Sequence, residues 1–235
     1  TDFTEDLQIT AGTGNIDFDG AVGGTTDLGN VTIVSAANVT ADLVFNANRV
    51  TQQNGTGATT FSGAVLLEAA GGMNLGSVAA LNNVIINGGV DTVSAANGGT
   101  VTVNLNGTLT IGDTGGAGDT AADLDLDGAF TQTTGTGAAV SMSGDITTTN
   151  DHISFSDDVT LTDTVALDTG AGAGTITFSD TLDGTQDLNL DAGTGGNIDF
   201  DGIVGTTRLG AVTITNADSV SADFGFTAGS ITQTA

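Results

Sequence analysis

The residues with the clearest chemical potential are pairs of aspartates that flank one apolar residue and precede a glycine. This D-x-D-G pattern occurs three times, as Asp17 with Asp19, Asp125 with Asp127, and Asp199 with Asp201. In a β-strand, alternate side chains point to the same side, so the two carboxylates of each pair face outward together when their apolar neighbours face inward. Calcium prefers such oxygen-rich sites. The motifs therefore predict candidate calcium sites, with solvated turn-forming aspartates as the alternative.

Catalysis is the second chemistry that paired carboxylates suggest, since two of them serve as acid and base in glycoside hydrolases. Sugar-binding clefts usually offer Trp or Tyr rings, and this chain has neither. A lyase that uses a basic residue has only Arg49 and Arg208 available, and the single His152 precedes a strand-like triplet at an expected exposed position. We therefore predict that the chain is not an enzyme, with no catalytic residue and no cofactor other than calcium.

The charge of the chain limits its partners. It carries 28 acidic and 2 basic residues, for a formal net charge of −26. Nucleic acids and anionic membrane surfaces are excluded as partners, because both require many Lys or Arg residues. Membrane insertion is not expected either, since no run approaches the roughly 20 apolar residues that cross a bilayer. An Asp-rich, Lys-free surface is also typical of adaptation to high salt, which explains the charge without any specific site.

Internal repetition is the main evidence for the fold. Residues 6–53 are repeated at 187–234, with an offset of 181 between Asp6 and Asp187. A shorter segment, 51–63, is echoed at 131–144 with an offset of 80, and its Thr-Gln pair returns at Thr232, with a further offset of 101. We interpret these offsets as nine, four and five multiples of about 20 residues, a length typical of one turn of a β-helix.

Within each expected turn, apolar residues alternate with polar ones. The Ile-x-Phe triplets at 153–155, 176–178 and 198–200 recur at nearly equal intervals. Such a triplet is typical of a short strand that buries its first and third side chains. Strands this short are stable only when stacked at about 4.8 Å on their equivalents in the next turn. An antiparallel sandwich would not require regular offsets.

The sequence therefore predicts an all-β fold, a parallel β-helix (β-solenoid) of about 10–12 rungs of roughly 20–23 residues each. The general preference for right-handed crossovers predicts a right-handed coil. We expect one continuous solenoid over residues 1–235, as an internal slice of a longer repetitive protein. An ice-binding surface is a weaker interpretation, because the Thr-x-Thr pairs recur at irregular intervals rather than once per rung.

The segments 11–33, 131–140 and 176–214 resemble the repeat regions of giant filamentous-haemagglutinin-like bacterial surface proteins, the β-strand-repeat adhesins. The resemblance covers essentially the whole chain. It implies a right-handed parallel β-helix, secretion to the bacterial cell surface, and a role in adhesion, biofilm or surface filaments. We expect a structural shaft or self-assembling filament element whose partners are neighbouring repeats or copies of itself, end to end. The alternative is an adhesin module that binds a cell-surface or matrix ligand.

Overall fold

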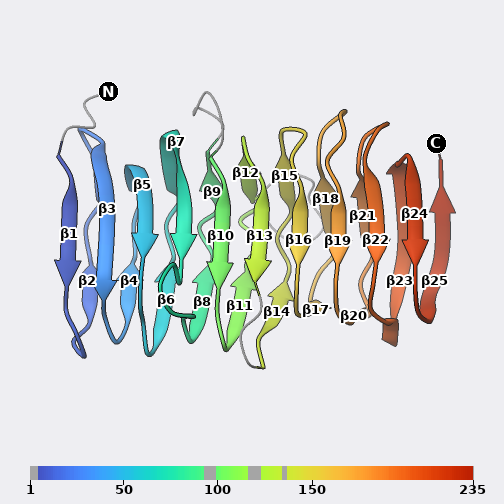
Figure 1. Cartoon of the computed structure of the whole chain (residues 1–235), viewed down its shortest axis with the longest axis horizontal. Coiled ribbons are helices and arrows are strands. Elements are labelled where there is room, and N and C mark those ends of the chain that lie inside the picture. The colour runs from blue at the N-terminus through green and yellow to red at the C-terminus, as the bar shows by residue number, and fades with distance from the viewer. Residues whose placement is uncertain (1–4, 93–98, 116–122, 134–136, 235) are drawn as a thin grey trace.

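The chain forms a rod of stacked β-strands, with the first and last described residues at opposite ends (Figure 1). The computed structural model describes residues 5–92, 99–115, 123–133 and 137–234, and every regular element within these ranges is a strand. All 25 described strands belong to one hydrogen-bonded array, and their pairings are parallel. The prediction of an all-β parallel solenoid is confirmed.

The rod has three faces, which the chain visits in turn. The first face stacks β1 (Leu7–Thr10), β3 (Leu28–Ser35), β5 (Phe45–Gln52), β7 (Val65–Leu75), β10 (Val101–Asn104), β13 (Phe130–Thr133), β16 (Ile153–Phe155), β19 (Ile176–Phe178), β22 (Asn197–Phe200) and β24 (Ser219–Ala222). The second face stacks β2 (Ile16–Phe18), β4 (Val39–Ala41), β6 (Ala58–Phe61), β8 (Asn83–Ile86), β11 (Thr108–Ile111), β14 (Ala139–Met142), β17 (Asp158–Leu161), β20 (Leu182–Gly184) and the beginnings of β23 (Val204–Asn216) and β25 (Phe226–Gln233). The third face stacks the beginnings of β5 and β7, then β9 (Val90–Asp91), β12 (Leu124–Leu126), β15 (Ile146–Thr148), β18 (Val165–Asp168), β21 (Leu188–Asp191) and the later parts of β23 and β25.

The solenoid has about nine turns, fewer than the 10–12 rungs that the repeat spacing predicts. Its turns differ in length: Val31 pairs with Val50 in one of the shortest, whereas Val90 pairs with Leu124 in the longest of the described pairings. That longest turn includes the connections from β9 to β10 and from β11 to β12. Corners of a solenoid tolerate insertions, whereas paired strands do not, so the strand register is regular while the turn length is not.

The interior is a column of apolar side chains that repeats from turn to turn. Ile153, Ile176 and Ile198 are paired in register, which confirms the alignment of the Ile-x-Phe triplets. The phenylalanines two positions later are fully buried, and the ring of Phe178 lies 5.4 Å from that of Phe155 and 5.5 Å from that of Phe200. The Phe178 ring therefore packs on its equivalents in the turns before and after it.

The long repeat does not return to the same face. Leu7 begins the first face, whereas its counterpart Leu188 lies on the third face, seven turns and two faces further along the paired strands. The offset of 80 from Thr51 to Thr131 corresponds to three turns, from β5 to β13, and not to four. Our interpretation of the offsets as whole multiples of one rung length is therefore wrong. All three faces are built from the same kind of short strand, so a repeated segment fits any of them.

Candidate metal centre

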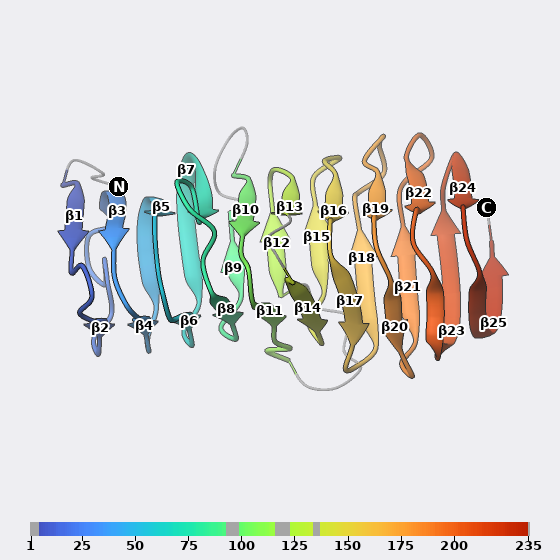
Figure 2. The ribbon, with the colours of Figure 1, turned by 60° about the horizontal axis from the view of Figure 1, so that its bottom comes forward.

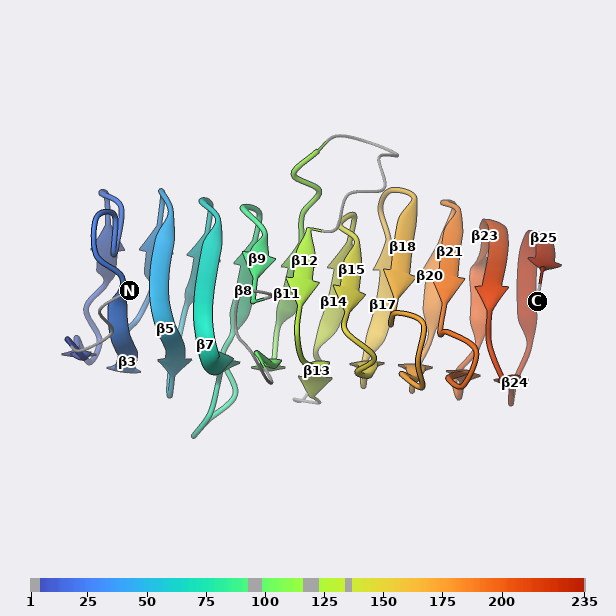
Figure 3. The same ribbon diagram turned by 90° about the horizontal axis from the view of Figure 1, so that it is seen from above.

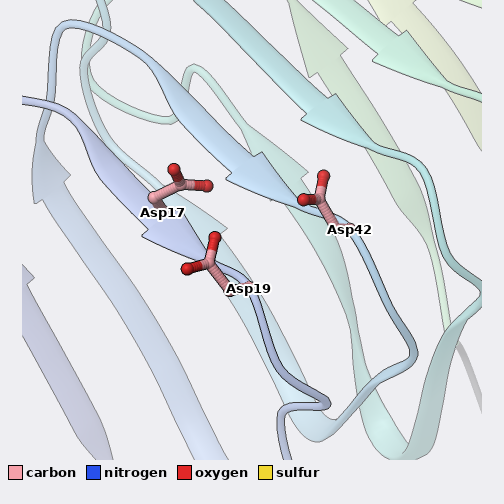
Figure 4. A group of neighbouring side chains, drawn as sticks. All are labelled: Asp17, Asp19 and Asp42. Carbon is pink, nitrogen blue, oxygen red and sulfur yellow. The ribbon is translucent and has the colours of Figure 1, made fainter.

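Three exposed aspartates from two adjacent turns come together at one edge of the second face (Figure 4). Asp17 lies on β2, and Asp19 follows that strand directly. Ile16 and Phe18 pair with Val39 and Ala41 of β4, which places Asp42 level with Asp19. The Asp42 N–H donates to the Phe18 carbonyl oxygen at 3.3 Å and fixes this corner against the preceding turn.

The group can hold a divalent cation. One carboxylate oxygen from each of Asp17, Asp19 and Asp42 lies within 4.8 Å of the other two. Calcium binds oxygen at about 2.3–2.6 Å, so two of its ligands can be at most about 5 Å apart. Three carboxylates supply up to six oxygens, and all three side chains are exposed, so water can complete the coordination.

Sequence reasoning identified Asp17 and Asp19 but missed Asp42. The D-x-D-G pattern marks only one strand, whereas the third carboxylate comes from the next turn, at the position level with Asp19. The interval from Asp19 to Asp42 equals the interval between the first two Ile-x-Phe triplets. A search for acidic residues one turn apart would therefore have found the complete group.

The second D-x-D-G motif forms a different arrangement. Asp125 on β12 pairs in register with Asp91 of the preceding turn, and both side chains point to solvent. Loss of solvent around the carboxyl group, and then the negative charge of Asp91, raise the pKa of Asp125. Asp127 is half-buried, and its N–H donates to the hydroxyl of Thr92 at 2.9 Å. Like charges one above the other make this a point of repulsion that a cation or a proton would relieve.

The third motif has the same backbone as the first but not the same group of carboxylates. Asp223 is the counterpart of Asp42, and its N–H donates to the Phe200 carbonyl oxygen at 3.0 Å. Asp199 is half-buried and accepts a hydrogen bond from the Ser221 hydroxyl at 2.9 Å. Among the residues that the structure describes, only Asp17, Asp19 and Asp42 form a compact set of three potential metal ligands. Among the described residues, the structure therefore brings no third carboxylate within ligand distance of both Asp199 and Asp201.

Many of the remaining aspartates connect one turn to the next. Asp6 Oδ1 accepts the Asn30 N–H at 2.6 Å, and its repeat counterpart Asp187 accepts the Ala211 N–H at the same distance. Asparagines do the same, as Asn83 does with the Thr108 N–H at 2.8 Å. These side chains accept strand N–H groups of the next turn in place of backbone carbonyl oxygens. Aspartates therefore contribute to the links between successive turns.

The repeated Thr-Gln pair positions a buried amide. Gln132 is fully buried, accepts the N–H groups of Ser156 and Asp157 at 3.0 and 3.2 Å, and donates to the Asp157 carboxylate at 2.5 Å. Gln52 is 1% exposed and accepts the Thr59 hydroxyl at 2.9 Å. The buried glutamine of the Thr-Gln pair thus attaches a neighbouring corner to the interior of the rod. The sequence did not indicate this role, because glutamine is a polar residue.

Three further findings bear on function. His152 is exposed, and its Nδ1 accepts the Thr175 N–H at 2.9 Å, so this side chain takes part in the same type of link between turns. In the described part of the chain, no helix is long and apolar enough to cross a membrane. Comparison of the chain with protein-family models, with curated proteins and with solved structures found no match. The function is therefore argued from the geometry.

Proposed function

We propose that this chain is a structural shaft of an extracellular bacterial surface protein, a rod that lengthens by adding turns to its ends. One observation carries the proposal: the stack continues to the last described turn, and β24 and β25 leave their apolar side chains open to solvent. Val220 is 38% exposed and Ile231 is 58% exposed. Both are inward positions of the strand pattern, because they pair with the buried Ile198 and Val212.

The open end has the form that a solenoid needs for growth. Two further views agree that β24 and β25 lie at the end of the stack, with no described strand beyond them (Figure 2, Figure 3). A strand with unpaired backbone groups and exposed apolar side chains is a template for another strand. A repeat protein gains stability mainly from contacts between neighbouring repeats, so an added turn is favourable.

The composition fits an element outside the cell. The net charge of −26 keeps long rods apart and soluble, and the charge is relieved by salt or divalent cations, which extracellular media supply. We propose that the group formed by Asp17, Asp19 and Asp42 binds calcium and stiffens its corner. Carboxylates from two successive turns share the ion in this arrangement, so its binding holds those turns together.

A ligand-binding adhesin is the second candidate, and one surface feature favours it. Phe224 and Ile203 are 62% and 44% exposed, and they line an open depression of about 330 Å³ together with Asp180 and Asp201. An exposed apolar pair beside carboxylates suits a ligand with an apolar face and hydroxyl or cationic groups. Binding to a panel of matrix glycans and peptides that is lost on Phe224→Ala, with the fold intact, would favour this function over the shaft.

The shaft proposal is tested by measuring assembly. The purified chain is examined over a concentration series by sedimentation and electron microscopy, beside a variant with Val220→Asp and Ile231→Asp. We expect rods that lengthen with concentration for the wild type and single short rods for the variant. A second variant, Thr213→Asp, adds a charge to an outward position of β23 and should assemble like the wild type. Wild-type rods of constant length at every concentration would contradict the proposal.

A further inference from the structure

The last turns of the rod reproduce the backbone pairing of the first turns. Leu7 pairs with Val31 in the first copy, and a bulge follows between Ile9 and Thr10. In the second copy, Leu188 pairs with Val212, and the bulge recurs between Leu190 and Asp191. The two copies therefore share register and irregularities, although they lie on different faces.

Side-chain packing is duplicated as well. The rings of Phe18 and Phe45 meet edge to face at 5.6 Å, and those of their counterparts Phe200 and Phe226 meet edge to face at 5.1 Å. The end of the rod formed by β24 and β25 thus corresponds to the side of β4 and β5 on which the next turn stacks.

In the first copy, that surface is covered by residues 54–75. Ala41 of β4 pairs with Phe61 of β6, and Phe45 and Val50 of β5 pair with Val65 and Met73 of β7. The Phe61 ring also meets the Phe45 ring edge to face at 5.9 Å. The inward apolar side chains on this surface, such as Val39, Ala41 and Phe45, are consequently at most 1% exposed.

In the second copy, the same positions lack this cover. Val220 is 38% exposed where Val39 is 1% exposed, and Ile231 is 58% exposed where Val50 is fully buried. The corner residues Leu43 and Phe224 are 52% and 62% exposed, so they are open whether or not a turn follows. The missing cover therefore accounts for the difference at the inward positions.

We propose that the edge of β24 and β25 is an acceptor for one kind of partner: a segment with the pairing pattern of residues 54–75, supplied by a following repeat of the same polypeptide. This inference rests on the proposed function and makes it specific. The partner places a large aromatic ring, as at Phe61, against Phe226. It places branched or flexible apolar side chains, as at Val65 and Met73, against Phe226 and Ile231.

The test is to append a second copy of residues 54–75 after Thr234 and to measure hydrogen–deuterium exchange. The Phe45 N–H donates to the Ala64 carbonyl oxygen at 2.8 Å in the first copy, so the Phe226 N–H should gain the equivalent bond. We expect amides of β24 and β25 to exchange at least about tenfold more slowly than in the original chain. The control carries the same extension with Phe61→Asp and Val65→Asp in the appended copy, and its β24 and β25 should exchange as in the original chain.

Amides of the interior strand β19 report whether each protein is folded, independently of the end. Unchanged exchange of β24 and β25 in the extended chain, with β19 protected, would overturn the inference. Equal protection by the extension with two aspartates would also overturn it, because the edge would then accept any strand. The comparison is made at a concentration where sedimentation shows single rods, and equal protection of the original chain there would also overturn the inference, because no added segment would then be needed.

Discussion

Two phenylalanines at equivalent positions of the long repeat, Phe45 and Phe226, allow the energetics of turn stacking to be measured by one substitution made twice. Phe45 is 1% exposed and touches rings on both sides, Phe18 at 5.6 Å and Phe61 at 5.9 Å. Phe226 is half-buried and touches one ring, Phe200, at 5.1 Å. The two positions thus differ mainly in whether a turn follows.

The structure sets the expected magnitudes. Truncation of a buried phenylalanine to alanine costs about 3–5 kcal/mol, and each aromatic pair accounts for about 0.5–1.5 kcal/mol beyond burial. We expect Phe45→Ala to cost about 4 kcal/mol, because the side chain loses complete burial and two ring contacts. Phe226→Ala should cost about half as much, roughly 2 kcal/mol, because partial burial and one ring contact are lost.

A repeat array need not unfold in one step, so the assay must report local stability. Urea denaturation gives the overall effect, and hydrogen exchange of the flanking strands gives the free energy of local opening. In the chain extended by residues 54–75, the cost of Phe226→Ala should rise toward that of Phe45→Ala. Equal costs at the two positions in the original chain would refute the reasoning, since burial by the next turn would then contribute nothing.

Three further predictions concern the polar residues. Calcium at about 10 mM should stabilise the chain by about 1–3 kcal/mol over sodium chloride of matched ionic strength, as expected for a site with a Kd of about 10⁻⁴–10⁻³ M. The calcium-dependent rise in melting temperature should be lost in Asp42→Asn and kept in Asp223→Asn. The Asp125→Asn variant should be more stable than the wild type at neutral pH, because an acid whose pKa is raised by folding destabilises the folded state when it is ionised. This gain in the free energy of unfolding should vanish as the pH falls below about 3.8, where Asp125 is protonated in the unfolded state as well. A gain independent of pH in urea denaturation would contradict this explanation. Gln132→Ala should lower the free energy of unfolding by about 3 kcal/mol, because it removes the partner of the buried Asp157 carboxylate and N–H and of the half-buried Ser156 N–H. A loss below about 1 kcal/mol in urea denaturation would show that water replaces the amide.

The sequence predicts the strands of this fold better than its turns. The Ile-x-Phe triplets reveal both the alternation and the pairing of Ile153, Ile176 and Ile198, because inward positions must stay apolar in every turn. The number of turns is less predictable, since a connection such as that from β11 to β12 can differ in length from its equivalents without changing the register of the paired strands.

The candidate metal centre shows the same division. The outward direction of Asp17 and Asp19 follows from strand alternation alone. The third carboxylate, Asp42, depends on the register between two turns, which the uncertain turn length concealed. The buried Gln132 was missed for another reason: a polar residue inside a solenoid is recognisable only when the corner that it binds is known.

The displacement of the long repeat by two faces has a consequence for assembly. Surface features that accompany the repeat, such as the exposed Leu43 and Phe224, lie on corners of different faces. In an array that continues this pattern, they would wind around the rod and return to the same face only after three repeats. A side-by-side contact needs one feature repeated along one face, whereas an end-to-end contact needs only that the last turn fit the next. The geometry therefore favours growth along the axis over lateral sheets of rods, and lateral sheets as the main assembled form would show that another surface governs association.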